Sequence, residues 1–254
     1  MNKENDVLEQ LSGRKSVRVF TDEPITEEER EQILTAASQA PTAGGMQLYS
    51  ILEIRDPKIK EVLAERCDHQ PFIAKAPLVW IFLADRRKWQ ELFSDYGIAT
   101  DPMTEADLFL AMDDALIAAQ NAVTAAWSLG IGSCYIGDIL EHYEENKELL
   151  HLPRYTAPCC MLVFGKPVQQ QKDRVKPVRL ANDDLVHVDV YNDKGKEPFV
   201  RQMEAERKRP VSEEDLKAMA ADTARRKFTS DFHTEMARSV RAILADWCDE
   251  KDPA

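Results

Sequence analysis

Three cations and a serine lie close together near the start of the chain, in the stretch "GRKSVRVF". Arg14 and Arg18 are four residues apart, so a helical turn would project both of them to one side. A guanidinium group can bind a phosphate through two parallel hydrogen bonds, and the Ser16 hydroxyl can donate another. With Lys15 between them, these residues form either a solvated basic surface or an anion site, and both interpretations are open.

A second basic segment runs from Lys166 to Arg179 and holds five cations against one acid. The same two interpretations apply to it. The whole chain has 254 residues and a formal net charge of -12. Such an acidic protein is not expected to bind nucleic acid or an anionic membrane, because both need a broad basic field. Two basic segments with a glycine-containing loop between them are compatible with one shared anionic ligand, and the interpretation as solvated surface stays open for both.

Other catalytic chemistry has little support in the sequence. The five cysteines include no CxxC pair, and the five histidines have no metal-ligand spacing, so we expect no metal site. We expect Cys134 and the adjacent Cys159 and Cys160 to pack as small apolar residues, and Asp113 and Asp114 to cap or to pair across an interface. There is no apolar run of a secretory signal or of membrane-spanning length, so we expect a cytoplasmic protein.

The elements that position these residues can be read from capping signals and apolar patterns. A capping box of Thr26 and Glu29 starts a helix that ends at Pro41, and Gly130 ends a long alanine-rich helix from Thr104. This long helix is either central with close neighbours or part of a subunit interface. Strands are expected over 49–55, 77–85, 131–139 and 158–167, with a short helix over 56–66. The pattern indicates an α+β or α/β domain with one sheet.

The carboxy-terminal part of the sequence has a different composition. Beyond His187 the chain is mostly charged helix, broken at Pro210, with Ser212 as the cap of a new helix and one more helix running to Trp247. We therefore expect a core over residues 1–190. Residues 191–254 would form a helical extension that packs on the core or on a partner subunit.

The order of several segments resembles the FMN-dependent nitroreductase family, in particular the branch of NADPH-dependent nitroreductases and flavin reductase P. The resemblance covers roughly residues 10 to 190. It is carried by "RKSVRVFTDEPITEEEREQILTAASQAPTAGGMQ", "CDHQPFIAKAPLVWIFLAD", "AAQNAVTAAWSLGIGSCYIGDI" and "VFGKP". It implies an α+β fold with a mixed, mainly antiparallel sheet flanked by helices, a helical C-terminal excursion, and a homodimer with FMN at the subunit interface.

The resemblance also implies how the first basic segment would bind FMN. Arg14 and Ser16 match phosphate ligands, and Lys15 matches a position near the phosphate, the ribityl chain or the ring. Arg18 matches a cation beside flavin N1 and O2. At about 4 Å and an effective dielectric near 20, such a cation contributes up to roughly 4 kcal/mol before desolvation.

Further positions match cofactor-binding segments of the family. Gln70 matches a residue at the pyrimidine edge of the ring, and Lys176 and Arg179 match a second phosphate-binding pair. Arg225 and Arg226 match the place of an arginine for the NADPH phosphate. The remaining matches are a loop along the ribityl and phosphate groups (Thr42, Ala43, Gly44, Gln47) and a segment beside the isoalloxazine (Tyr135, Ile136, Gly137, Asp138).

Three features depart from the family pattern. Gly45 stands where many members have asparagine. The second phosphate-binding pair lies in the sequence "KPVR", which has one extra residue, Val178. Arg174, Lys176 and Arg179 therefore all remain candidates for contact with the FMN phosphate. Ala220 stands where another cation is expected, so both NADPH and NADH remain as candidate reductants.

The resemblance implies an enzyme whose chemistry is supplied by FMN, with no catalytic residue of the protein itself. NAD(P)H would reduce the flavin and leave before a nitroaromatic, quinone, azo compound or free flavin binds, in a ping-pong sequence. Two alternatives are a specialised ene-reductase or dehalogenase, and a flavin-binding regulatory or storage protein without efficient turnover. The physiological acceptor cannot be named from the sequence.

Overall fold

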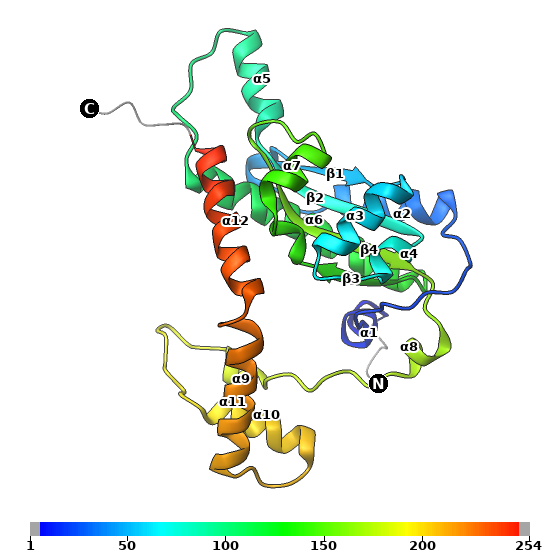
Figure 1. Ribbon diagram of the computed structural model, residues 1–254, viewed down its shortest axis with the longest axis vertical. Coiled ribbons are helices and arrows are strands. Elements are labelled where there is room, and N and C mark those ends of the chain that lie inside the picture. The colour runs from blue at the N-terminus through cyan, green and yellow to red at the C-terminus, as the bar shows by residue number, and fades with distance from the viewer. Residues whose placement is uncertain (1–5, 249–254) are drawn as a thin grey trace. The chain divides into compact units, whose positions relative to one another are not determined.

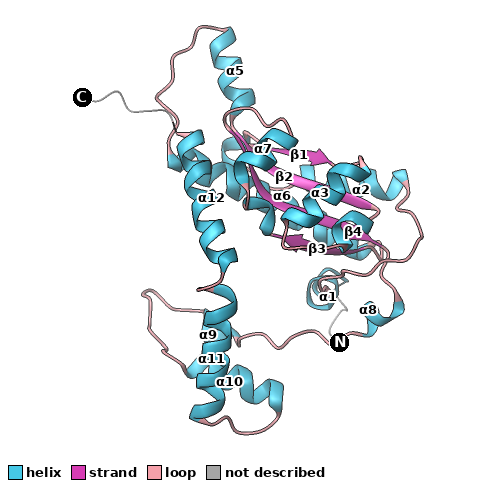
Figure 2. Cartoon of the chain, viewed as in Figure 1, coloured by secondary structure: helices cyan, strands magenta, loops and turns pink. Residues whose placement is uncertain are grey.

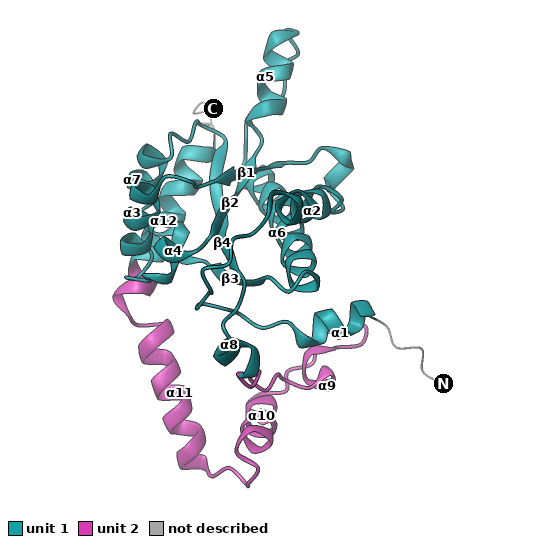
Figure 3. Cartoon of the chain, turned by 90° about the vertical axis from the view of Figure 1, so that its right-hand side faces the viewer, with its two compact units in different colours: residues 1–173, 235–254 teal, residues 174–234 magenta. Residues whose placement is uncertain are grey.

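A computed structural model describes residues 6–248 of the chain (Figures 1 and 2). The chain divides into two compact units (Figure 3). The first unit contains the residues up to Asp173 and those from Glu235 onward, and the second unit is Arg174–Thr234. The expected division of the protein at residue 190 stays a prediction.

The first unit is built on one four-stranded antiparallel sheet. The strand order is β1-β2-β4-β3 (β1 Tyr49–Glu53, β2 Leu78–Asp85, β3 Gly132–Ile136, β4 Thr156–Gly165). Every residue of the two central strands, β2 and β4, is buried, because helices cover both faces of the sheet. All four strands were expected from the sequence. The expected strand over 131–139 ends early at Ile136, where a turn leads into the short 3-10 helix η2 (Asp138–Leu140).

Helices cover the two faces of this sheet in separate groups (Figure 3). One face is covered by α2 (Glu27–Ser38) and α6 (Glu105–Ser128). The other is covered by α3 (Pro57–Arg66), α4 (Phe72–Lys75), α7 (Tyr143–Leu149) and the part of α12 (Asp231–Trp247) that belongs to this unit. The remaining elements of the unit are α1 (Asp6–Gly13), η1 (Ala43–Gly45), α5 (Arg87–Asp95) and α8 (Gln169–Asp173).

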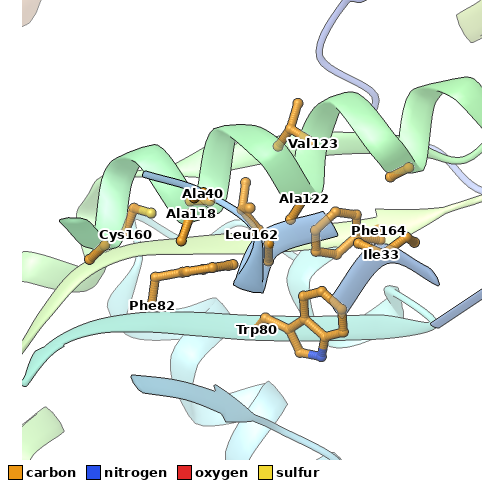
Figure 4. Packing of buried hydrophobic residues seen from close by; sticks show 14 of the residues in the cluster. Ile33, Ala40, Trp80, Phe82, Ala118, Ala122, Val123, Cys160, Leu162 and Phe164 are labelled. Carbon is orange, nitrogen blue, oxygen red and sulfur yellow. The ribbon is translucent and has the colours of Figure 1, made fainter. Parts of the chain in front are cut away.

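The long helix α6 lies close to the sheet because its inner face is made of small residues. Ala115, Ala118, Ala119 and Ala122 are fully buried and let the helix backbone approach the strands. Figure 4 shows this helix above the large side chains of the sheet (Trp80, Phe82, Leu162, Phe164). The predicted capping box at Thr26 begins α2. The helix α6 begins after Thr104, as predicted, and the Thr104 amide donates to Asp107 Oδ2 at 3.0 Å.

A bulge in β4 accounts for the packing of the adjacent cysteines. Phe82 pairs with Cys160, whereas Leu83 pairs with Pro158, so Cys159 is an extra residue in the ladder. Both cysteines therefore contribute to the same apolar cluster beneath α6. Their burial confirms the expectation that they pack as apolar residues.

The second unit is helical. It holds α9 (Asn182–Leu185), α10 (Glu197–Arg207), α11 (Glu213–Lys227) and the first residues of α12. The Ser212 hydroxyl accepts a hydrogen bond from the Asp215 amide at 3.1 Å and caps α11, as predicted. None of the helices in residues 6–248 has the length and apolar character needed to cross a bilayer.

Candidate functional site

The first basic segment runs alongside β3, the edge strand of the sheet. Ser16 forms a parallel bridge with Ser133, and the Val17 amide donates to the Ser133 carbonyl at 2.9 Å. The backbone here is extended. The Arg14 amide makes a last helical hydrogen bond to the Gln10 carbonyl at 3.0 Å, and from Ser16 onward the segment pairs with the edge strand. The helical turn considered for Arg14 and Arg18 is therefore wrong.

Two glycines let this segment approach the sheet. A Cβ atom on Gly132 would lie 2.5 Å from Val17 Cγ2, and one on Gly165 would lie 2.6 Å from the Phe20 ring. Both distances are far shorter than ordinary contact, so only glycine leaves room for the segment. These two positions in β3 and β4 determine how closely the cations can lie to the sheet.

Side chains of the segment alternate between two sides, as extended backbone requires. Burial raises the pKa of the Cys134 thiol, and the charges of Arg18 and Arg14 together with the Ser16 hydroxyl act in the opposite direction. These three residues therefore gather around one point of β3. The Lys15 ammonium instead binds the Lys172 carbonyl, and both lysines line a separate cavity of about 430 Å³.

The charges of this segment fit a bound phosphate. Among the described residues, neither Arg14 nor Arg18 has a carboxylate within ion-pair distance, and Arg14 is half-buried. Lys166 is different, because its ammonium binds Glu29 at 3.2 Å and Glu23 at 2.5 Å. The Arg14 guanidinium beside the Ser16 hydroxyl supplies donors that a phosphate dianion needs, and Arg18 adds a second cation beside the same strand. The residues present can therefore hold the phosphate of FMN.

Gln70 and Asp138, both expected at the flavin ring, are brought together by the fold. Gln70 Nε2 donates to Asp138 Oδ2 at 3.0 Å and to the Cys67 carbonyl at 2.7 Å. The Arg18 guanidinium lies over the Phe72 ring, 6.0 Å from its centre, at the start of the helix that follows Gln70. The end of β3, the loop before α4 and the first basic segment thus converge in one region of the first unit.

The loop of Thr42, Ala43, Gly44 and Gln47 is held by one buried carboxylate. Asp114 Oδ1 accepts from the Ala43 amide at 2.9 Å, and its Oδ2 accepts from the Leu48 amide at 3.0 Å and from the Thr42 hydroxyl. That hydroxyl accepts in turn from the Gln47 amide at 2.7 Å. Asp114 lies in α6 and is 2% exposed. The shape of the loop is therefore determined from within the core.

The segment from Tyr135 to Asp138 leaves the sheet beside this region. Ile136 is buried, the Tyr135 hydroxyl donates to Gln120 Oε1 at 3.4 Å, and Gly137 has open space where a side chain would be. Glu141 follows, with 5% of its surface exposed and its Oε1 without a hydrogen-bond partner among the described residues. Burial, with the negative charges of Asp138, Asp68 and Glu235, raises the pKa of Glu141 to about 7.

The other expected ligands lie in the second unit. Lys176 and Arg179 precede α9, and Arg225 and Arg226 lie near the end of α11. The two α11 arginines share one carboxylate, since each binds Asp222 at 2.7 Å. Their expected roles at the FMN and NADPH phosphates stay predictions, as does the choice of Arg174.

Several residues that shape this region were not predicted from the sequence to do so. Asp114 was considered only as a cap or an interface residue, although a carboxylate within the alanine face of α6 is the signal that could have identified it. Gly132 and Gly165 could have been noted as glycines inside strands. The exposed ring of His69, which precedes Gln70, pairs with Glu65 at 2.8 Å.

Comparison with known proteins gives a consistent result. Residues 11–166 match the model of the nitroreductase family. The chain is 36% identical over 186 residues to an oxygen-insensitive NADPH nitroreductase of Salmonella typhimurium, covering 72% of this chain and 74% of that protein. It is 32% identical over 190 residues to an FMN reductase (NADPH) of Bacillus subtilis, covering 74% and 75%.

Solved structures agree with the sequence relatives. The NADPH:FMN oxidoreductase of Vibrio harveyi, solved in complex with NAD+, has a TM-score of 0.75 and 26% identity, covering 94% of this chain and 98% of that one. NfrA2 of B. megaterium has a TM-score of 0.81 and 25% identity, covering 98% and 100%. The expected α+β fold is confirmed. This chain therefore belongs to the nitroreductase family.

Proposed function

We propose that this protein is an FMN-dependent oxidoreductase that takes electrons from NAD(P)H and passes them to nitroaromatic, quinone, azo or flavin acceptors. The observation that carries the proposal is the convergence of Arg14, Ser16 and Arg18 beside β3, with no carboxylate of the described residues within ion-pair distance of either guanidinium group. Relatives named as NADPH nitroreductase, FMN reductase and Cr(VI) reductase support the same reaction class. The proposed order is ping-pong.

In this proposal the chain binds and orients the cofactor, and FMN, when bound, supplies hydride acceptance and donation. Arg14 and Ser16 bind the phosphate. Arg18 places positive charge beside the pyrimidine part of the ring, where negative charge develops on reduction. The Gln70 amide and the backbone around Gly137 orient the ring. No protein nucleophile is needed.

The proposed assembly is a homodimer with the flavin at the subunit interface. Its support is an apolar stripe on the outer side of α6, where Phe109 is 66% exposed and Leu110, Leu116 and Ile117 are also exposed. Exposed apolar side chains grouped on one helix mark interaction surfaces. Sedimentation should give twice the chain mass of 28.9 kDa. We also propose a cytoplasmic location, supported by five cysteines that are all free.

The visible spectrum of the purified protein tests the cofactor directly. We expect a yellow protein, or one that takes up added FMN. Anaerobic addition of NADPH or NADH should bleach the flavin, and a nitroaromatic or quinone should restore its colour. A colourless protein that does not take up FMN would refute flavin binding. A yellow protein whose flavin is bleached by neither NADPH nor NADH would refute the proposed oxidoreductase activity.

A further inference from the structure

A second cavity lies at the β1 edge of the sheet, whereas the first basic segment lies along β3 at the other edge. Its volume is about 260 Å³. Three cations line it, Arg30 from α2, Arg55 after β1 and Lys60 from α3, together with the two carboxylates of Glu27 and Glu53. Arg30 Nη1 also binds Glu27 at 2.9 Å and Glu31 at 2.5 Å, so Arg30 is already paired, and the donors left for a ligand belong to Arg55 and Lys60.

One of these carboxylates is already fully engaged. Glu53 Oε2 accepts from Arg30 Nε at 2.7 Å and from Trp80 Nε1 at 2.9 Å, and Oε1 accepts from Arg55 Nε. Burial acts against ionisation, but these hydrogen bonds hold the pKa of Glu53 below its usual range. Glu53 is therefore held by both arginines, of which Arg30 is shared with Glu27 and Glu31.

Among the three cations of the lining, Lys60 is the one without an ion pair to any described residue. Its ammonium donates to the Ala76 carbonyl at 3.0 Å, and no carboxylate within residues 6–248 lies within 4 Å of it. The side chain is half-buried, and burial lowers its pKa. The Lys60 ammonium has lost part of its hydration and uses only one of its three N–H donors. An anion can therefore accept hydrogen bonds from the other two.

Two properties of the cavity narrow the class of anion. Apolar residues form the rest of the wall; Ile25 and Pro77 are accessible, whereas Ile54 and Leu78 are buried behind it. The volume is below the range of about 300–1,000 Å³ of pockets for drug-sized ligands. The carboxylate of Glu27 also lines the cavity and would repel a dianion more strongly than a monoanion.

From this arrangement we propose that the cavity binds a small organic monocarboxylate with an apolar body. The carboxylate of the ligand accepts hydrogen bonds from Lys60 and from the terminal nitrogens of Arg55, which donate to no described residue. The apolar body packs against Ile25 and Pro77. The site is separate from the proposed flavin-binding residues and does not depend on the proposed reaction.

Benzoate is a suitable probe, with benzyl alcohol and inorganic phosphate as comparisons. Titration is followed by the backbone amide NMR signals of Ile54, Arg55 and Leu78 in the full chain saturated with FMN, so that binding elsewhere is not counted. We expect benzoate to shift these signals and Lys60→Met to weaken the binding about tenfold, as for the loss of one charged hydrogen bond. Lys58→Met, an exposed lysine of the same helix, should leave the affinity unchanged.

Benzyl alcohol and phosphate test whether the site selects a monocarboxylate. Benzyl alcohol should bind about tenfold more weakly than benzoate, because it lacks the charge. Phosphate should shift the signals less than benzoate at equal concentration. Lys60→Gln repeats the test if the thermal melt shows that methionine perturbs folding. Unshifted signals, equal binding by the Lys60 variants, or equal binding of phosphate would each overturn the proposal.

Discussion

Asp114 Oδ1, in the middle of α6, accepts a hydrogen bond at 2.9 Å from the backbone amide of Ala43. The same carboxylate also binds the Leu48 amide and the Thr42 hydroxyl. One buried side chain thus satisfies three donors of a loop that would otherwise have no partner in the core. The loop and the long helix are therefore a single structural unit.

Replacing Asp114 tests this relationship. Asp114→Ala would leave three donors unsatisfied, and we expect a loss of about 3 kcal/mol in the free energy of unfolding. Asp114→Asn keeps the shape and one acceptor oxygen, and should lose less. Urea denaturation measures both. Glu61→Ala, at an exposed position of α3 away from this helix, is the control and should change stability by less than about 0.5 kcal/mol.

The two glycines beneath the first basic segment give a steric prediction. Gly132→Ala places a methyl group against Val17, and overpacking of this kind costs about 1–3 kcal/mol. Thermal unfolding should show the loss, and the double variant with Val17→Ala should recover part of it. Gly137→Ala, at φ -80° with no atom within 4 Å of its Cβ, should melt as the native protein does. If Gly132→Ala and Gly137→Ala lowered the melting temperature equally, the contact with Val17 would not be the cause.

Glu141 gives a pH dependence. Because the folded state raises its pKa from 4.5 to about 7, the folded protein holds this proton more tightly than the unfolded chain. Its contribution to stability is complete below pH 4.5 and is lost as the pH rises through 7, by up to about 3 kcal/mol. Glu141→Gln should therefore be more stable than the native protein at pH 8 and similar to it at pH 4.5.

Chemical denaturation across this pH range measures the difference. Glu148→Gln, at an exposed position of α7, is the matched control and should keep the native pH profile. A constant difference between Glu141→Gln and the native protein at every pH would contradict the raised pKa.

Arg14 and Arg18 should separate cofactor retention from reduction. Arg14→Ala removes a proposed phosphate ligand and should weaken FMN binding by about 10- to 100-fold. Arg18→Ala should lower the rate of anaerobic flavin reduction more than it lowers FMN retention, since in our proposal its charge stabilises the reduced ring. Fluorescence titration and stopped-flow absorbance measure the two effects.

Arg87→Ala is the control for both variants, because this arginine of α5 pairs only with Glu91 among the described residues. It should change neither FMN affinity nor reduction rate. If Arg18→Ala released FMN while Arg14→Ala slowed reduction, the two roles would have to be exchanged.

Much of the fold could be predicted because its signals are local. The helix starts at Thr26, Thr104 and Ser212 and the apolar runs of β2 and β4 each depend on residues next to one another in the chain. Family resemblance supplied the fold class and the candidate flavin residues, which no pattern of composition could have named.

The rest depends on partners far apart in the chain. Ser16 meets Ser133 and Ala43 meets Asp114, and neither pairing leaves a local pattern in the sequence. The extended conformation of the first basic segment follows from the free edge of β3, not from its own residues. Glu141 likewise looks like an ordinary acid of a loop until the fold buries it.

The alternation of side chains along the first basic segment limits how this region can change in evolution. A point substitution at Lys15 alters the side away from Cys134 and leaves Arg14, Ser16 and Arg18 in place. A one-residue insertion or deletion after Ser16 would instead move the arginine now at position 18 to the opposite side. Related proteins should therefore vary in residue type at the position of Lys15 while keeping the number of residues between the two arginines constant.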